Sequence, residues 1–319
     1  MAPLIEVKHL KKYFDVPGGK NHAVDDVTFT IEHGQTLGVV GESGCGKSTL
    51  GRTVIRLQEP TDGQVFLNGE DISHVSGRAL RKAREKMQIV FQDPYSSLNP
   101  RMSITSTLIE PLKRSGRFHS KKELNDEVER LMDLVGIDER FRHAYPHELD
   151  GGRRQRVGIA RALALNPEFI MCDEPVSALD VSIQAQVLNL LMDLQDQLGI
   201  AYMFVTHDLS VVKHISDHIM VMYLGQAVEK SETKELFKNT LHPYTKVLLS
   251  AIPSTDIDHP MERLRLKGEI TSAINPEQGC RFKARCPYAT EKCGQPQQLE
   301  EVLPNHFVSC CRVRELNNL

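Results

Sequence analysis

Residues 36–50, TLGVVGESGCGKSTL, decide the fold of this chain. They place Gly41, Gly46, Lys47 and Ser48 in the order G-x-x-x-x-G-K-[ST], between an apolar run and a helix-like run. This strand–loop–helix context is typical of a phosphate-binding P-loop. Its glycines let backbone N–H groups point at phosphate oxygens, and the helix N-terminus adds partial positive charge. The stretch therefore predicts nucleotide binding, with Lys47 reaching the β- and γ-phosphates and the Ser48 hydroxyl ligating Mg²⁺.

The composition is that of an ordinary globular protein. The 319 residues are 40% hydrophobic and 25% charged, and the net charge of −3 gives no sign of a nucleic-acid partner. No apolar run approaches the roughly 18 residues that span a bilayer. The start, MAPLIEVKHLKKYF, lacks the apolar core of a signal peptide. We therefore expect a cytoplasmic protein whose membrane role, if it has one, comes through a partner.

Hydrophobic periodicity predicts strands that alternate with helices. Strands with one or both faces buried are expected at residues 5–7, 27–31, 87–91, 169–172 and 202–205, with a hairpin turn at Asn68-Gly69. Helices are expected at residues 120–136, 152–165 and 182–198, the first of them opened by a capping box of Ser120 and Glu123. This alternation predicts an α/β fold with a mostly parallel sheet and helices on both faces. Periodicity fades after about residue 240, where a domain boundary is expected.

Polar side chains follow three of the predicted buried strands. Residues 169–174, FIMCDE, end in two carboxylates, of which Asp173 would hold Mg²⁺ through its water shell and Glu174 would polarise the attacking water. Gln92 follows the strand at 87–91, and His207 follows the strand at 202–205. Because parallel strands deliver such residues to the ligand crevice, both are predicted to contact the γ-phosphate.

Five of the seven cysteines crowd the last forty residues: Cys280, Cys286, Cys293, Cys310 and Cys311. In a cytoplasmic protein such a cluster indicates metal binding more than disulfides. The spacings of the first four match no standard Cys-x2-Cys zinc pattern. The residues alone therefore leave zinc, an iron–sulfur cluster and free thiols as alternatives.

These motifs stand in one fixed order along the chain. Residues 41–49 are followed by Gln92, LDGGRRQRVGIARAL (149–163), the strand at 169–174, SALD (177–180) and His207. In this order the chain resembles the ATP-binding subunits of ABC transporters, over about residues 4–250. The resemblance implies a P-loop NTPase with a RecA-like core, an antiparallel β subdomain and a helical subdomain at about 95–160. It also implies head-to-tail pairs of such domains that sandwich two ATP molecules, and it leaves residues 251–319 as a small Cys-rich extension.

Three further segments are similar to the dipeptide and oligopeptide permease ATPases: QDPYSSLNPRM (92–102), PVSALDVSIQAQV (175–187) and LHPYTKVLLSAIP (241–253). The resemblance implies a peripheral subunit at the cytoplasmic face of the membrane that hydrolyses ATP for peptide import. Its partners would be a second ABC ATPase, two transmembrane permease subunits and an extracellular peptide-binding protein. The alternatives are a soluble ABC ATPase without a membrane partner and a regulatory nucleotide switch in which Glu174 is idle. Neither the cargo nor the partner ATPase can be read from the residues.

The resemblance also assigns roles residue by residue. The catalytic residues are Glu174, His207, Lys47 and Gln92. The ATP-binding residues are Phe14, Gly41, Glu42, Ser43, Gly44, Cys45, Gly46, Lys47, Ser48, Thr49, Gln92, Asp150, Gly151, Gly152 and Asp180. Phe14 would stack on adenine, with the adjacent Tyr13 as the fallback and core packing as the alternative. The Mg²⁺ ligands are Ser48, Gln92 and Asp173, and a [4Fe–4S] cluster is implied at Cys280, Cys286, Cys293 and Cys310, with Cys311 as a spectator.

The signature segment departs from the family pattern Leu-Ser-Gly-Gly-Gln. Here it reads Leu149-Asp150-Gly151-Gly152-Arg153. A serine donates a hydrogen bond to the γ-phosphate, whereas an ionised aspartate only accepts, and two like charges about 4 Å apart repel by roughly 4 kcal/mol at an effective dielectric of 20. We therefore hypothesise a heterodimer whose site built with Asp150 turns over slowly. The alternative is that Asp150 protonates or swings away, and Arg153 offers a charge that offsets part of the repulsion.

Overall fold

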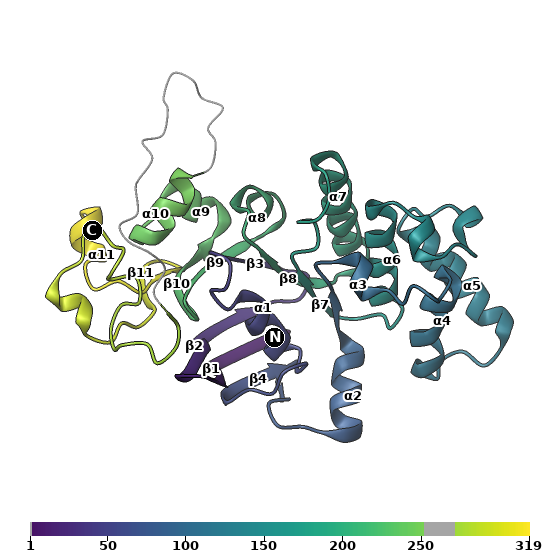
Figure 1. Cartoon of the computed structure of the whole chain (residues 1–319), viewed down its shortest axis with the longest axis horizontal. Coiled ribbons are helices and arrows are strands. Elements are labelled where there is room, and N and C mark those ends of the chain that lie inside the picture. The colour runs from purple at the N-terminus through teal and green to yellow at the C-terminus, as the bar shows by residue number, and fades with distance from the viewer. Residues whose placement is uncertain (1, 252–271) are drawn as a thin grey trace, which may run out of the picture. The chain divides into compact units, whose positions relative to one another are not determined.

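The computed structural model describes residues 2–251 and 272–319 (Figure 1). These residues form two compact units, each built from several segments of the chain. The helical unit comprises Met1–Leu4, Glu32–Gln35 and His74–Met203. Among the described residues, the P-loop unit comprises Ile5–Ile31, Thr36–Ser73, 204–251 and 272–319. Residues 252 and 253, at the end of the segment 241–253 quoted above, lie outside the described residues, and the domain boundary expected after residue 250 stays a prediction.

A four-stranded antiparallel sheet forms one part of the P-loop unit. Its strand order is β2 (Gly19–Ile31), β1 (Ile5–Val16), β4 (Asp62–Leu67) and β5 (Glu70–Asp71). The predicted alternation is confirmed, because Val27, Phe29 and Ile31 are buried and the threonines between them are exposed. Asn68 and Gly69 connect β4 to β5 with φ angles of 51° and 79°, as a tight hairpin turn requires. This sheet is the antiparallel β subdomain that the resemblance implies.

Five strands of the second sheet lie in the P-loop unit, and one of them leads into the phosphate-binding loop. Strand β3 (Thr36–Val40) is buried along its whole length and pairs in parallel with β9 (His218–Tyr223). Strands β10 (Gln226–Glu232), β12 (His306–Val308) and β11 (Glu300–Leu303) follow in antiparallel order. The pair β3 and β9 is parallel, as expected, whereas β10, β12 and β11 are antiparallel additions that the expectation of a mostly parallel sheet did not include. Only two residues separate β9 from β10, and a connection that short permits only antiparallel pairing.

The P-loop unit also contains helices, including those of the C-terminal extension. They are α1 (Lys47–Val54), α8 (Leu209–Ile215), α9 (Thr233–Lys238), α10 (Pro243–Ser250), the short η3 (Glu291–Gly294) and α11 (Val313–Asn317). Leu241, Val308 and Val313 form a small apolar cluster that joins the segment before α10 to β12 and α11. The C-terminal extension thus packs on the same unit as the phosphate-binding loop.

The helical unit consists of helices around two parallel strands, β6 (Met87–Val90) and β7 (Phe169–Asp173). Its helices are α2 (Gly77–Lys86), α3 (Pro94–Ser97), α4 (Ile104–Ser115), α5 (Lys121–Leu134), η1 (Glu139–Phe141), η2 (Pro146–Glu148), α6 (Gly151–Leu163) and α7 (Val181–Leu198). Strand β8 (Ala201–Thr206) begins in this unit and ends in the P-loop unit. The strands predicted at residues 87–91, 169–172 and 202–205 are confirmed to within two residues.

The three predicted helices are confirmed as α5, α6 and α7, although the capping box of α5 is only half formed. The Ser120 hydroxyl accepts a hydrogen bond from the Glu123 N–H at 3.1 Å, as expected. The Glu123 carboxylate, however, accepts its close hydrogen bond from the N–H of His119, at 2.8 Å. The carboxylate has reached one residue further back, which still satisfies a backbone donor before the helix.

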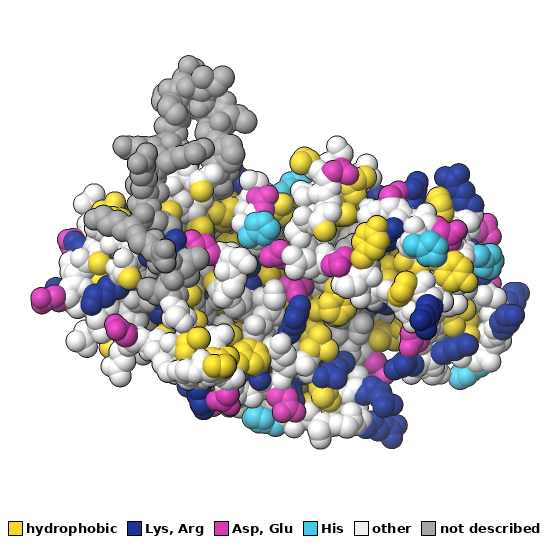
Figure 2. Space-filling model, in the orientation of Figure 1, with side chains coloured by type: hydrophobic (Ala, Val, Ile, Leu, Met, Phe, Trp, Pro, Cys, Tyr) yellow, Lys and Arg dark blue, Asp and Glu magenta, His cyan; other side chains and the backbone are white. Residues whose placement is uncertain are grey.

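The surface mixes charges of both signs. On the face drawn in Figure 2, basic, acidic and apolar side chains are interspersed over the helical unit, in keeping with the net charge of −3. In the described part of the chain, no helix has both the length and the apolar character needed to cross a membrane.

Candidate active site

The phosphate-binding loop connects β3 to α1 through backbone conformations that favour glycine. Gly41 has a φ angle of 155° and Gly46 one of 104°. A Cβ atom on Gly46 would lie 1.9 Å from the carbonyl oxygen of Ala23, so no other residue fits there. Gly46 is also the N-cap of α1, and it supplies no side chain to the N–H groups of the first turn. Those N–H groups make the start of α1 suitable for an anion.

Lys47 lies inside this loop and is only 4% exposed. Its Nζ donates to the carbonyl oxygens of Gly41 at 2.8 Å and Glu42 at 3.0 Å. The adjacent Cys45 is buried as well, and burial raises the pKa of its thiol, an effect that the charge of Lys47 partly opposes. The loop therefore holds one positive charge next to the backbone N–H groups that would bind phosphate.

The remaining loop residues line an open pocket of about 320 Å³. Glu42, Ser43, Gly44 and Cys45 face Asn21, Tyr223, Leu224, Ser272, Ala273 and Ile274 across it. The backbone N–H of Glu42 does not point into this pocket, because it donates to the Tyr244 hydroxyl oxygen at 2.9 Å. Ser48 and Thr49 follow in the first turn of α1.

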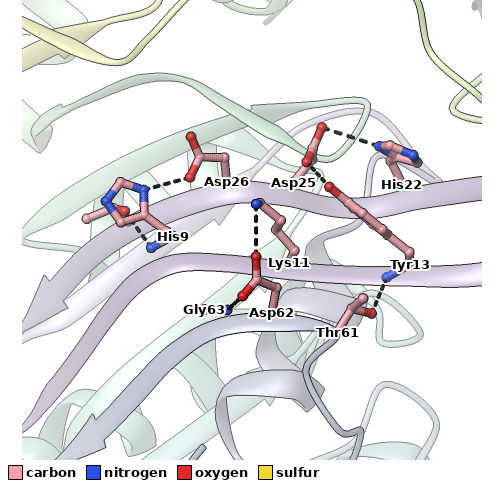
Figure 3. A network of polar contacts seen from close by, with 10 residues as sticks. His9, Lys11, Tyr13, His22, Asp25, Asp26, Thr61, Asp62 and Gly63 are labelled. Carbon is pink, nitrogen blue, oxygen red and sulfur yellow. Dashed lines mark hydrogen bonds and ion pairs between the residues drawn. The ribbon is translucent and has the colours of Figure 1, made fainter.

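The two aromatic candidates for adenine stacking differ in the contacts that they make within the P-loop unit. Tyr13 stacks on His22 with ring centroids 3.9 Å apart, and its hydroxyl donates to Asp25 at 2.5 Å (Figure 3). Burial and this hydrogen bond raise the pKa of Tyr13. Phe14, the next residue in β1, is partly exposed, and the Lys12 Nζ lies 4.9 Å from its ring centroid. Because Tyr13 is committed to its partners within the unit, the structure leaves Phe14 as the better candidate.

Two predicted catalytic residues meet in the helical unit. The Gln92 Nε2 donates to the Glu174 Oε2 at 3.0 Å, although the residues are 82 positions apart. Glu174 directly follows β7 and has a φ angle of 47°, a conformation that is costly for a residue with a Cβ atom. Such strain is common at functional sites, where the surrounding structure maintains it. The preceding carboxylate, that of Asp173, is 1% exposed at the end of β7.

The signature segment forms the N-terminus of α6. Asp150 is the N-cap, and its Oδ1 accepts from the Arg153 N–H at 2.8 Å. Its Oδ2 forms an ion pair with the Arg153 guanidinium. A Cβ atom on Gly152 would lie 2.6 Å from the Ile183 side chain of α7, so Gly152 permits the close approach of the two helices. Asp180 caps α7 in the same way, by accepting from the Ile183 N–H at 3.0 Å.

The predicted site residues are thus shared between the two units. Phe14, the loop residues 41–49 and the exposed His207 belong to the P-loop unit, whereas Gln92, the segment 150–152, Asp173, Glu174 and Asp180 belong to the helical unit.

Four cysteines of the C-terminal extension gather around one small cavity of about 10 Å³: Cys280, Cys286, Cys293 and Cys310. Burial raises the pKa of Cys280 to about 12, and the three neighbouring thiols add to this shift. Cys311 is exposed, yet its Sγ lies 3.9 Å from that of Cys293. Within residues 2–251 and 272–319, no three His, Cys, Asp or Glu side chains are arranged as a metal-binding group. The implied [4Fe–4S] cluster therefore stays a proposal.

Comparison with known proteins identifies the family. Residues 24–177 match the family model described as ABC transporter, and residues 228–293 match that of the oligopeptide/dipeptide transporter C-terminal region. The oligopeptide transport ATP-binding protein AppF of Bacillus subtilis is 50% identical over 318 residues, which cover 96% of each chain. The chain belongs to the ABC transporter family. The dipeptide transport ATP-binding protein DppF of Haemophilus influenzae is 49% identical over 319 residues, covering 98% of this chain and 97% of the relative.

Solved structures agree with this family. The dimeric post-hydrolysis structure of the ATP-binding cassette MJ0796 with ADP and Pi superposes with a TM-score of 0.67 at 29% identity, over 72% of this chain and 98% of that one. The predicted fold class, a P-loop NTPase with α/β architecture, is confirmed, and so is the resemblance to the peptide-importer ATPases. As a member of this family, the chain is an ATPase.

Several residues that contact the phosphate-binding loop or strand β2 were not predicted from the sequence. Tyr244 binds the N–H of Glu42, and Arg285 pairs with the Glu42 carboxylate. Arg281 forms an ion pair with Asp25. These residues lie between 200 and 260 positions from their partners and belong to no nucleotide-binding motif, so no local pattern could have marked them.

Proposed function

We propose that this chain hydrolyses ATP to power the import of dipeptides or oligopeptides. The observation that carries the proposal is the match over 96% of the chain to an oligopeptide transport ATP-binding protein, together with the C-terminal region typical of that branch. The proposed partners are two transmembrane permease subunits, a second ABC ATPase and, through the complex, an extracellular peptide-binding protein. The chain would lie at the cytoplasmic face of the membrane as a peripheral subunit.

The proposed chemistry follows from the residues at the site. Glu174, held beside Gln92, would orient and polarise a water molecule for in-line attack on the γ-phosphate. The ammonium group of Lys47 would stabilise the charge that develops on the transferred group, and His207 would fix the γ-phosphate position. Ser48, Gln92 and Asp173 offer the oxygen ligands that Mg²⁺ prefers, and bound Mg²⁺ supplies neutralisation of phosphate charge.

Isolation of the assembled complex tests the proposed partners. We expect this chain, purified through an affinity tag from its host membrane, to bring down two permease chains and one further ABC ATPase. Deletion of its gene should abolish uptake of a labelled dipeptide or oligopeptide, and restoration should recover it. A chain that purifies alone from the soluble fraction, with peptide uptake unaffected by deletion, would favour the soluble ABC ATPase.

The signature segment supports a pair with unequal sites. Asp150→Ser keeps an N-cap that accepts from the Arg153 N–H and removes the negative charge near the partner's γ-phosphate. Both side chains of the Asp150–Arg153 pair are about half exposed, so the pair offsets only part of the repulsion. We expect ATPase activity of the assembled complex to rise roughly twofold, because relief of the charge repulsion lets a second site turn over. An unchanged rate would mean that Asp150 protonates or swings away.

We further propose that the C-terminal extension binds a [4Fe–4S] cluster. Cys280, Cys286, Cys293 and Cys310 fit it in number and ligand type, since four thiols face one small cavity. Anaerobically purified protein is expected to absorb at about 400 nm and to lose this band in the Cys286→Ser variant. The matched control, Cys311→Ser, should retain the band. Stoichiometric zinc without iron would contradict the proposal.

A further inference from the structure

Two arginines of the C-terminal extension contact acidic residues of the nucleotide-binding half of the P-loop unit. Arg285 makes a bidentate ion pair with Glu42, with Nη1–Oε2 and Nη2–Oε1 distances of 2.7 and 3.0 Å. Arg281 forms an ion pair with Asp25 and also donates to the carbonyl oxygen of Leu224. Their side chains are only 8% and 6% exposed. Pairs that are bidentate or this well buried fix geometry, unlike exposed ion pairs.

The partner of Arg285 is part of the phosphate-binding loop itself. Glu42 directly follows Gly41, and its carbonyl oxygen accepts from Lys47 at 3.0 Å. A carboxylate at this position without a counter-charge would repel the phosphates that the loop binds. Arg285 supplies the counter-charge and turns the carboxylate toward itself, while Tyr244 holds the N–H of the same residue. Glu42 is thus fixed at three points, by Lys47 within the loop and by Arg285 and Tyr244 from elsewhere in the unit.

The partner of Arg281 organises the strands on the adenine side. Asp25 accepts from the Tyr13 hydroxyl and lies 3.5 Å from the His22 Nδ1, and Figure 3 shows both side chains directed at it. Tyr13 and His22 stack and neighbour Phe14, the candidate for adenine stacking. The Asp25 N–H also donates to the carbonyl oxygen of Gly225, whose own N–H donates to that of Cys45. Asp25 therefore links these strands to the phosphate-binding loop.

The segment that carries both arginines has a fixed conformation. The N–H groups of Arg285 and Cys286 both donate to the Phe282 carbonyl oxygen, at 3.0 and 2.9 Å, which makes a tight turn. Phe282 is 1% exposed, and its ring centroid lies 5.3 Å from those of both Tyr223 and Tyr244. Both ends of the segment are cysteines of the small cavity, so packing and the cysteine cluster together hold the arginines in place.

We propose that Arg285 and Arg281 are positioning residues of the ATP site, through which the C-terminal extension sets the conformation of the phosphate-binding loop and the adenine-side strands. The inference rests on the proposed binding of ATP at this loop. It assigns the extension a role in nucleotide affinity. The arginines touch neither the reacting atoms nor the catalytic carboxylate; they act through Glu42 and Asp25.

Titration of the full-length chain with a fluorescent ATP analogue tests this role. Arg285→Gln is expected to weaken binding roughly tenfold, because the carboxylate of Glu42 loses its charged partner inside the loop. The double variant Glu42→Gln/Arg285→Gln should recover most of that loss, since it carries no unpaired carboxylate. Arg314→Gln, an exposed arginine of the same extension, serves as the matched control and should bind as the wild type does. In the assembled transporter, Arg285→Gln should raise KM for ATP with little change in kcat.

The outcomes separate this inference from the proposed function. If the wild type fails to bind the analogue, the proposed ATP site itself is wrong. If the wild type binds and Arg285→Gln binds within twofold of it, while thermal unfolding shows only lower stability, the contact is purely structural and the inference is overturned. A double variant no better than Arg285→Gln alone overturns it as well. Where Arg285→Gln does not fold, the double variant, compared with Glu42→Gln, supplies the same test.

Discussion

ATP hydrolysis is expected to fall roughly 10²- to 10³-fold when Glu174 is replaced by glutamine, with ATP binding retained. The substitution keeps the size of the side chain and an oxygen that accepts from the Gln92 Nε2. It also keeps the backbone strain, because glutamine has the same cost at a φ angle of 47°. What it removes is the negative charge that orients and polarises the attacking water. The measurement is the steady-state ATPase rate of the assembled complex.

The matched control for this substitution is Glu129→Gln, which removes an exposed carboxylate from α5 in the same unit. It should leave the rate unchanged, and both variants should unfold at the wild-type temperature. A Glu174→Gln variant that hydrolyses ATP within threefold of the wild type would show that Glu174 is idle. That result would favour the regulatory nucleotide switch over the transport ATPase.

Peptide uptake is expected to be lost when Lys47 is replaced by alanine. Lys47 is 4% exposed, and its ammonium group donates to the carbonyl oxygens of Gly41 and Glu42, so its charge is built into the loop. Loss of a charge-assisted bond to phosphate should weaken ATP binding roughly 10- to 100-fold. Uptake of a labelled peptide by cells and binding of an ATP analogue by the purified chain measure the two effects.

Lys234→Ala is the control for this variant, since Lys234 is an exposed lysine of α9 in the same unit. It should support uptake at the wild-type rate. If cells with Lys47→Ala imported peptide equally fast, the loop around Lys47 would not supply the energy for transport. The proposed mechanism would then have to be abandoned.

The sequence by itself determined the features that depend on contiguous residues. The phosphate-binding loop, the strands that end in Asp173 and before Gln92, and the helix that Ser120 caps follow from local spacing and backbone geometry. They form because each element satisfies its own backbone groups and presents one apolar face. The order of the motifs sufficed for the family resemblance, which the comparisons confirmed.

Only the tertiary structure decided which distant side chains meet. Gln92 reaches Glu174 across 82 residues, and Arg285 reaches Glu42 across 243. Four cysteines with no standard spacing gather at one cavity, and β12 adds to the edge of β10 because its backbone needs a partner strand. These contacts depend on how separate segments pack. A buried charge needs a partner charge and a strand edge needs a neighbouring strand, and in the fold these partners come from residues that are distant in the sequence.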